Sequence, residues 1–230
     1  MRLALLENMI SLLYPEVCAA CGNVLFRQEN TICTKCHYLL PKTGYENQVD
    51  NPLAQIFFGR VAFHAVTACF FFSKKGKIQH LVHELKYKKN REAGYFLGRE
   101  MGKILVESPL FNDVDFAIPT PLHPKRQHQR GYNQSEILAQ GINQVMHRKI
   151  STTHLLRAVN TATQTKKSRE ERYENMKNTF VLKNATELEG KHVLLVDDVI
   201  TTGATLEACG KILLEVPNIK VSVAAAACAG

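Results

Sequence analysis

An unbroken apolar run near the C-terminal end of the chain gives the strongest structural signal. Residues 193–196 read Val-Leu-Leu-Val without a polar residue, which is typical of a strand buried on both faces, as in a parallel sheet covered by helices. Asp197 and Asp198 follow at once, and a Thr- and Gly-rich turn occupies 201–205. Apolar residues at helical spacing come next, so the pattern predicts a strand, an acidic pair, a turn and a helix.

The same pattern divides the rest of the chain into alternating strands and helices. Apolar runs predict strands at 66–72, 116–119 and 221–227. Apolar residues spaced three and four apart predict helices around 78–85, 97–105 and 135–146. Strands that alternate with helices predict an α/β fold, in which helices flank a parallel sheet.

The turn after the strand at 193–196 has the chemistry of a phosphate-binding loop. Its residues are Thr201, Thr202, Gly203, Ala204 and Thr205. The glycine lets the backbone approach a ligand closely, and the threonine hydroxyls add hydrogen-bond donors. The helix that follows offers unpaired backbone N–H groups and the positive end of its dipole. The two aspartates before the turn can accept hydrogen bonds from ribose hydroxyls or hold a hydrated Mg²⁺.

Other phosphate-binding loops do not fit this turn. A Walker A loop requires a lysine after its last glycine, and the G-x-G-x-x-G dinucleotide fingerprint is absent. The turn resembles the 5-phosphoribosyl 1-pyrophosphate (PRPP) motif of type I phosphoribosyltransferases. The alternative is an ordinary strand end with two solvated aspartates and a Thr-rich cap, which we disfavour because the complete combination is unusual.

A second candidate segment follows the strand at 116–119. It is basic over 125–130, and Gly131 comes directly after Arg130. A lone basic run is usually a solvated loop before a helix. This run follows a strand at its carboxyl end, however, so we expect it to face the same crevice as the Thr-Gly turn. The Arg130 guanidinium and the Gly131 backbone are therefore candidates to bind pyrophosphate oxygens.

Two cysteine pairs near the N-terminus have the spacing of a metal site. Each is a C-x-x-C sequence, and eleven residues separate Cys18 and Cys21 from Cys33 and Cys36. Four thiolates in this arrangement predict a tetrahedral structural zinc site in a small ribbon-like module. Iron fits the same ligands. Two disulfides are the alternative, which the expected intracellular location disfavours.

Composition and charge limit the class of protein and of partner. With 45% hydrophobic and 22% charged residues, the chain is globular rather than disordered. A net charge of +8 favours an anionic partner, such as a polyphosphate, a nucleotide or a nucleic acid. No apolar run is long enough to span a membrane. Because polar residues interrupt the leucines at the N-terminus, we expect a short amphipathic helix there rather than a signal peptide, and a cytoplasmic protein.

The chain is expected to divide into two parts near residue 60. Residues 1–59 would contain the amphipathic helix, the cysteine module and a linker with Pro, Gly and Asn at 41–59. Residues 60–230 would form the phosphate-binding domain. Within it, the polar segment at 157–180 is best interpreted as an exposed charged helix, and as a whole it is a candidate for a flap over the ligand.

In combination, these segments resemble ComF-type proteins (the ComF/GntX group), which join an N-terminal four-cysteine zinc module to a type I phosphoribosyltransferase domain. The resemblance rests on CAACG and CTKC at the cysteine pairs, on HELKYKKN around Lys86, and on PTPLHPKRQHQRGYNQSEILA at 119–139. It also rests on NTATQTKKSREERYENMKNTF at 160–180 and VLLVDDVITTGATL at 193–206. It therefore spans nearly the whole chain.

The resemblance implies a PRPP site on a type I phosphoribosyltransferase fold. It implies that Asp197 and Asp198 hold the ribose hydroxyls as the catalytic pair, and that the Thr-Gly turn holds the 5′-phosphate. It implies Arg130, Gly131 and Lys86 for the pyrophosphate, with Mg²⁺ bound alongside PRPP and zinc in the cysteine module. ComF proteins are associated with natural competence, so single-stranded DNA and proteins of the competence machinery are implied as partners.

Two classes of function remain open. The first is an enzyme in which a nitrogen nucleophile displaces pyrophosphate from C1 of the sugar; no Ser/His/Asp or Cys/His arrangement for covalent catalysis is apparent. The second is a non-catalytic module that senses PRPP or holds single-stranded DNA or a competence partner. The sequence does not identify the acceptor. In this superfamily a variable hood selects it, and we expect the cysteine module and linker in the place of the hood.

Overall fold

The computed structural model describes residues 15–158 and 179–229. The expected N-terminal amphipathic helix and most of the segment at 157–180 lie outside the described residues. Within them, the centre is a five-stranded sheet of order β1-β7-β6-β2-β3, in which every neighbouring pair is parallel. Its strands are β1 (Ala65–Phe72), β2 (Phe116–Pro119), β3 (Lys149–Ile150), β6 (His192–Ile200) and β7 (Lys220–Ala229).

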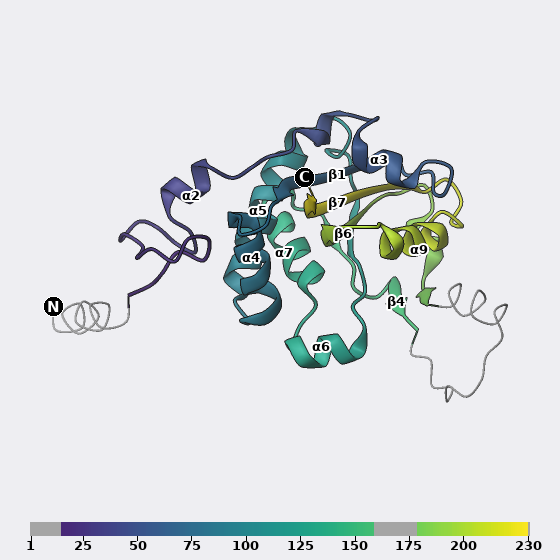
Figure 1. Cartoon of the computed structure of the whole chain (residues 1–230). Helices are drawn as coiled ribbons and strands as arrows, with labels where there is room; N and C mark the ends of the chain where they lie inside the picture. The colour runs from purple at the N-terminus through teal and green to yellow at the C-terminus, as the bar shows by residue number, and fades with distance from the viewer. Residues whose placement is uncertain (1–14, 159–178, 230) are drawn as a thin grey trace.

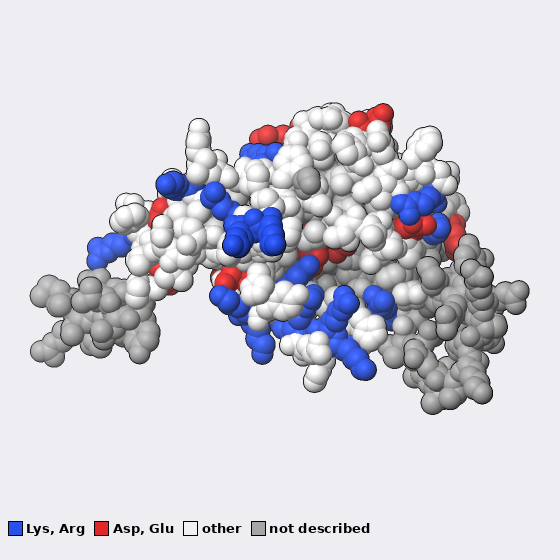
Figure 2. Space-filling model, viewed as in Figure 1, with Lys and Arg blue, Asp and Glu red and all other residues white. Residues whose placement is uncertain are grey.

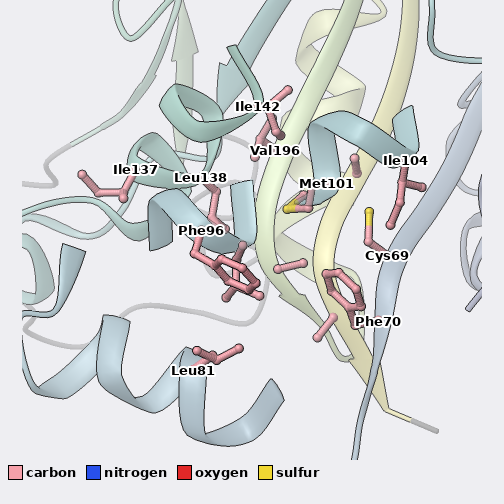
Figure 3. Packing of buried hydrophobic residues seen from close by; sticks show 14 of the residues in the cluster. Cys69, Phe70, Leu81, Phe96, Met101, Ile104, Ile137, Leu138, Ile142 and Val196 are labelled. Carbon is pink, nitrogen blue, oxygen red and sulfur yellow. The ribbon is translucent and has the colours of Figure 1, made fainter. Parts of the chain in front are cut away.

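Helices cover both faces of this sheet, which confirms the predicted α/β class (Figure 1). One face is covered by α4 (Lys77–Tyr87), α5 (Arg91–Glu107) and α7 (Gln134–Met146). The other face is covered by α3 (Pro52–Phe57) and α9 (Ala204–Leu213). Figure 3 shows the first of these interfaces, where Phe70 of β1 and Val196 of β6 meet Met101 of α5 and Leu138 of α7.

The apolar run in β6 explains how one strand serves both layers. Leu194 and Val196 pack with the α5 and α7 side, whereas Val193 and Leu195 pack with the α9 side. All four side chains are completely buried. Because full burial of such a side chain contributes about 1.5–3 kcal/mol, this run fixes the strand that carries the acidic pair.

Residues 41–59, expected as a linker, pack against the sheet instead. They contain a 3₁₀ turn (Tyr45–Asn47) and α3, and both Leu53 and Phe57 are buried against the sheet. The Asn51 side chain caps α3 and also donates a hydrogen bond to the Val66 carbonyl. A helix this short shows no periodicity, so the Pro and Asn that start it look like linker residues. The division near residue 60 stays a prediction.

The remaining described elements are short. They are α2 (Thr34–Tyr38) in the cysteine module, α6 (Pro124–Arg130), an antiparallel pair of β4 (Leu155–Arg157) and β5 (Phe180–Leu182), and a 3₁₀ turn (Ala185–Leu188). None of the helices in the described part of the chain is long and apolar enough to cross a membrane.

Candidate functional site

A cavity of about 530 Å³ opens at the carboxyl ends of β1, β7, β6 and β2. Strand β6 contributes Asp197 and Asp198, and the turn after it and the start of α9 contribute Thr201 and Thr205. Most of the remaining wall comes from α4 and from the segment after β2. Figure 2 shows acidic atoms in a hollow on this face, with Lys and Arg side chains gathered around it over α4 and α6. Parallel sheets place ligands at this edge, which is where the sequence predicts the site.

The acidic pair lies inside β6 rather than after it. The strand continues to Ile200, and Asp197 pairs with Ala225 of β7. The sequence predicts the strand end at Val196, because apolar side chains stop there. The backbone pairing continues, since β7 runs to Ala229 and supplies partners that the side-chain pattern does not reveal.

Asp197 is held in one orientation by its neighbours. Its Oδ1 accepts hydrogen bonds from the Thr120 hydroxyl at 2.8 Å, the Ser135 hydroxyl at 3.1 Å and the Asp198 backbone N–H at 2.9 Å. Burial, and then the negative charge of Asp198, raise the pKa of Asp197 to about 6. The two hydroxyl residues, one directly after β2 and one in α7, are neighbours of the site that sequence reasoning missed, because neither belongs to a charged or Gly-rich pattern.

Asp198 forms an ion pair with Lys86 of α4. The Lys86 Nζ lies 2.8 Å from Asp198 Oδ1, and the two side chains are only 19% and 16% exposed. The resemblance implies Lys86 as a pyrophosphate contact, and the structure places its ammonium on the acidic pair. Lys86 thus offsets one of two adjacent negative charges in a partly buried site.

The Thr-Gly turn, which the sequence predicts to bind a phosphate, lines a small hollow of its own. Thr201, Thr202, Gly203, Ala204 and Thr205 line a space of about 50 Å³ together with Asp197 and their neighbours. The glycine is the N-cap of α9 in the left-handed conformation, and no side chain caps that helix. The three threonine side chains are exposed, and none has a hydrogen-bond partner among the described residues. Free N–H and hydroxyl donors at a helix N-terminus favour an anion.

Three arginines line the opposite part of the cavity. They are Arg126 and Arg130 of α6 and Arg157 of β4. Arg130 donates to Gln134 at 2.6 Å and lies 5.6 Å from the centre of the Tyr87 ring. No carboxylate pairs with any of the three in the described part of the chain. Burial, and then the positive charge of Arg126, lower the pKa of Arg157, so an anion bound between them would relieve a repulsion.

The basic segment is therefore a short helix rather than the solvated loop that a basic run usually forms. Pro124 begins it, the His123 side chain accepts from the Lys125 N–H, and Gly131 ends it at φ 82°. Gly131 is not one of the described residues that line the cavity, whereas Arg130 beside it is. Arg126 and Arg157 were not singled out from the sequence, because each is one of many basic residues in its segment.

Comparison with known proteins bears on this geometry. Residues 141–229 match the phosphoribosyl transferase domain family. This stretch contains β6, the acidic pair, the Thr-Gly turn and α9, while the arginine-bearing α6 precedes it. The site described above therefore lies partly in the stretch that matches this family and partly in the residues before it.

Curated relatives confirm the resemblance to ComF-type proteins. The chain is 32% identical to DNA utilization protein YhgH of Escherichia coli O6:H1 over 137 residues, which are 58% of this chain and 60% of that protein. It is 40% identical to competence protein F of Haemophilus influenzae over 107 residues, 45% of this chain and 47% of that one. For competence protein ComFC of Bacillus subtilis the identity is 36%, over 47% of this chain and 42% of that one. The matched part thus spans about 60% or less of the length of these relatives.

Solved structures of low sequence identity are also similar. Glutamine PRPP amidotransferase from B. subtilis is 20% identical, with a TM-score of 0.43 over 59% of this chain and 26% of that one. A hypoxanthine phosphoribosyltransferase from Staphylococcus aureus is 13% identical, with a TM-score of 0.38 over 59% of this chain and 63% of that one.

The four predicted cysteines come together, outside the stretch that matches the phosphoribosyl transferase domain family. The sulfurs of Cys18, Cys21, Cys33 and Cys36 all lie within 4.8 Å of one another. Cys21 and Cys33 Sγ are 3.9 Å apart, and a tetrahedral zinc with bonds of about 2.3 Å would separate its sulfurs by about 3.8 Å. The donor set therefore fits a tetrahedral metal ion.

The local backbone favours a thiolate at Cys18. Burial would raise the pKa of Cys18, but hydrogen bonds from backbone N–H groups, first that of Cys33 at 3.2 Å, lower it to about 7. His37, next to the second cysteine pair, is not part of this cluster, and its Nε2 lies 2.9 Å from Glu100 of α5. This contact joins the cysteine module to the helical layer.

The cysteine module and residues 41–59 do not contribute to the cavity. None of its described lining residues precedes Phe72. The expectation that they replace the hood is therefore wrong for this cavity, and α4 with the end of β1 forms the wall instead. The module packs against α5, on a helical layer, because Ile32, Cys36 and Leu40 join the hydrophobic cluster there.

One Ser/His/Asp chain that the sequence did not reveal lies at the start of β6. His192 Nδ1 lies 2.6 Å from Asp113 Oδ1, and its Nε2 lies 2.8 Å from Ser222 Oγ. Ser222 is completely buried, so no substrate can reach its hydroxyl. Burial lowers the pKa of His192, and the group connects β6, β7 and the segment before β2 as a structural link.

Proposed function

We propose that this chain binds PRPP in the cavity and transfers its phosphoribosyl group to a nitrogen acceptor. One observation carries the proposal: a single cavity combines an uncapped helix N-terminus, a carboxylate pair and three arginines that lack carboxylate partners among the described residues. These groups match the 5′-phosphate, the ribose hydroxyls and the pyrophosphate of PRPP.

The residues take the following roles in this proposal. Thr201, Thr202, Gly203, Ala204 and Thr205 bind the 5′-phosphate through hydroxyls and backbone N–H groups. Asp197 and Asp198 accept hydrogen bonds from the ribose hydroxyls. Arg126, Arg130 and Arg157 bind the pyrophosphate, with the Gly131 backbone beside them. Lys86 stands at the acidic pair, where it offsets charge next to the reacting carbon.

The transfer needs no covalent protein intermediate. The acceptor nitrogen donates its lone pair to C1, the C1–O bond to pyrophosphate breaks, and the electron pair leaves on the pyrophosphate oxygen. The proton of the acceptor nitrogen passes to water. Arginines that are already in place stabilise the charge that develops on the leaving group. Mg²⁺, which we propose to enter with PRPP near Asp197 and Asp198, would add positive charge there.

Release of pyrophosphate from PRPP tests this proposal. We would incubate the protein with PRPP, Mg²⁺ and a panel of nucleobases and amines, and measure pyrophosphate. The wild type should release it with at least one acceptor, and Asp198→Asn should lower the rate at least tenfold. Asp50→Asn, at an exposed position away from the cavity, is the matched control. Tight PRPP binding without turnover over the whole panel would contradict the transferase.

A second candidate function is binding of single-stranded DNA at the mouth of the same cavity. Tyr87 is 66% exposed, and Arg130, the last residue of the basic helix α6, lies over its ring. Such an aromatic and Arg pair suits base stacking and phosphate contact, and the relatives are named as DNA utilization and competence proteins. We propose single-stranded DNA and competence-machinery proteins as partners on this ground.

Anisotropy titration with a labelled oligonucleotide over a salt series tests the second candidate. Affinity should fall as salt rises, and Tyr87→Ala should weaken it severalfold. Tyr38→Ala, at a position 88% exposed on the cysteine module, should have no effect. Undetectable binding at low salt would remove this candidate.

We further propose zinc in the cysteine site and a cytoplasmic location. Four free thiols in one cluster support both, because a reducing compartment keeps thiols available for metal.

A further inference from the structure

The cavity has two walls of different chemistry, one on each side of the acidic pair. In the sheet, β6 lies between β2 on one side and β7 with β1 on the other. The β2 side leads into α6 and its arginines, whereas the β1 side leads into α4. If pyrophosphate leaves toward the arginines, an in-line acceptor must approach C1 from the α4 side. This step rests on the proposed function.

One face of α4 forms that wall. Gln79, Val82, His83 and Lys86 are spaced three and four apart, and all four line the cavity, as does Phe72 at the end of β1. Lys86 extends to Asp198, so the ribose end of the wall is fixed. Gln79, Val82 and His83 precede Lys86 along the helix, so they lie beyond the ribose end of the wall, where the acceptor would sit.

The charges of the cavity disfavour a cationic acceptor. The acidic residues among its described lining are Asp197 and Asp198. One oxygen of Asp197 accepts from the Thr120 and Ser135 hydroxyls, and the proposed function assigns its other oxygen to the ribose, while Asp198 is paired with Lys86. With the ribose bound, a protonated amine would find no carboxylate left to pair with and would face several positive side chains. An uncharged acceptor meets no such penalty.

The Gln79 amide has a defined orientation. Its Oε1 accepts a hydrogen bond from the Lys75 backbone N–H in the turn after β1. Since a backbone N–H only donates, the amide oxygen must face Lys75, and the Nε2 group is left to donate elsewhere. No partner for Nε2 is found among the described residues. Gln79 therefore offers the acceptor site a donor, which pairs with an acceptor group on the ligand.

We propose that Gln79 determines acceptor specificity: its Nε2 donates to a carbonyl oxygen at the edge of an uncharged nitrogen heterocycle. Val82 and Phe72 supply apolar contacts for the ring faces, and His83 bounds the site toward solvent. A ring whose edge carries an amino group in that position presents a donor to a donor and is rejected.

Calorimetric titration with ribose 5-phosphate and with nucleoside 5′-monophosphates tests this proposal. The Kd of ribose 5-phosphate measures binding to the phosphoribosyl site alone. The ratio of this Kd to that of a nucleotide measures the affinity that the heterocyclic ring adds. The probes are IMP and UMP, which carry edge carbonyls, and AMP and CMP, which carry amino groups. At least one of IMP and UMP should bind at least tenfold more tightly than ribose 5-phosphate. That nucleotide should also bind more tightly than its amino counterpart, which is AMP for IMP and CMP for UMP.

Gln79→Glu is the decisive variant, because a carboxylate still accepts from the Lys75 N–H but no longer donates. It should remove the advantage of IMP or UMP and leave the Kd of ribose 5-phosphate unchanged. Gln144→Glu, an equal change of charge at an exposed position of α7, is the control and should change neither.

Each outcome decides something different. If ribose 5-phosphate binds but no nucleotide binds more tightly, the proposed function stands and the acceptor inference is overturned. If a nucleotide binds more tightly and Gln79→Glu keeps that advantage, the role of Gln79 is overturned. If ribose 5-phosphate itself does not bind, the proposed function fails and the inference fails with it.

Discussion

At the scale of single residues, the site depends on how Asp197 is held. One carboxylate oxygen accepts three hydrogen bonds, while its other oxygen accepts none from the described residues. The carboxylate is therefore oriented before a ligand arrives, and one oxygen remains for a sugar hydroxyl. Such preorganisation lowers the cost of binding, because no side-chain rotation has to be frozen.

The raised pKa of Asp197 predicts an unusual dependence of stability on pH. The folded protein holds this proton with a pKa of about 6, whereas an unfolded chain holds it near 3.9. Between these values the folded state binds more protons, so the free energy of unfolding should rise as pH falls from 7 to 5. From pH 7 to pH 5, the free energy of unfolding should rise by about 1 kcal/mol more in the wild type than in an Asp197→Asn variant, as measured by urea unfolding. Parallel pH profiles of the two proteins would contradict it.

The sequence indicates the acidic pair but not the side chains that hold it. Asp197 and Asp198 stand out because they follow an apolar run. Thr120 and Ser135 do not, since a buried hydroxyl on another element gives no local signal. Arg157 was likewise included only in a long basic segment. Residues that a site recruits through tertiary contact require coordinates, whereas residues in one contiguous motif do not.

At the scale of elements, the turn proposed to bind phosphate depends on α3 as well as on β6 and α9. Gly203 has a φ of 73°, and a Cβ placed on it would lie 2.7 Å from the Phe57 ring. The helix that resembled a linker in the sequence thus packs on the turn from outside. This contact limits the turn to glycine for two reasons, backbone conformation and space.

Substitution of Gly203 separates these two reasons. Gly203→Ala should lower the free energy of unfolding by about 2–4 kcal/mol, from positive φ and from overlap with Phe57. Gly190→Ala is the matched control, because its φ is 65° and nothing lies within 4 Å of its Cβ position. The control should lose only about 1–2 kcal/mol in the same denaturant titration. Equal losses would show that the Phe57 contact does not matter.

Buried apolar strands and long periodic helices were predictable, and short helices were not. The buried runs in β1, β2, β6 and β7 and the periodic helices α4, α5 and α7 are all confirmed. Side-chain patterns failed where they carry too few periods, as in α3 and α6. They also misplaced the end of β6, because strand pairing depends on β7 and not on the polarity of Asp197 and Asp198.

At the scale of the whole molecule, the cysteine module is part of the packing but not of the cavity. Cys18, Cys36, Ile32 and Leu40 share one hydrophobic cluster with the α4, α5 and α7 layer. The His37–Glu100 contact reinforces this join. A metal in the module should therefore stabilise the fold and influence ligand binding only indirectly.

Metal analysis should find about one zinc per chain, because four thiolates complete a tetrahedral site. Cys33→Ser should lose the metal and melt at a lower temperature. Cys69→Ala changes a buried cysteine of β1 that is not one of the four clustered thiols, and this variant should keep the metal. A well-folded protein without metal, or one with iron in place of zinc, would refute the zinc assignment.

Titration calorimetry of the protein with PRPP tests the central claim most directly. The wild type should bind PRPP, and binding should require Mg²⁺. The Asp197→Asn/Asp198→Asn double variant, with an unchanged circular dichroism spectrum, should lose at least tenfold in affinity, because the ribose hydroxyls lose their charged partners. No heat of binding in the wild type, with or without Mg²⁺, would contradict the account: the carboxylate pair and phosphate turn would then be a scaffold, and the DNA-binding function would become the leading one.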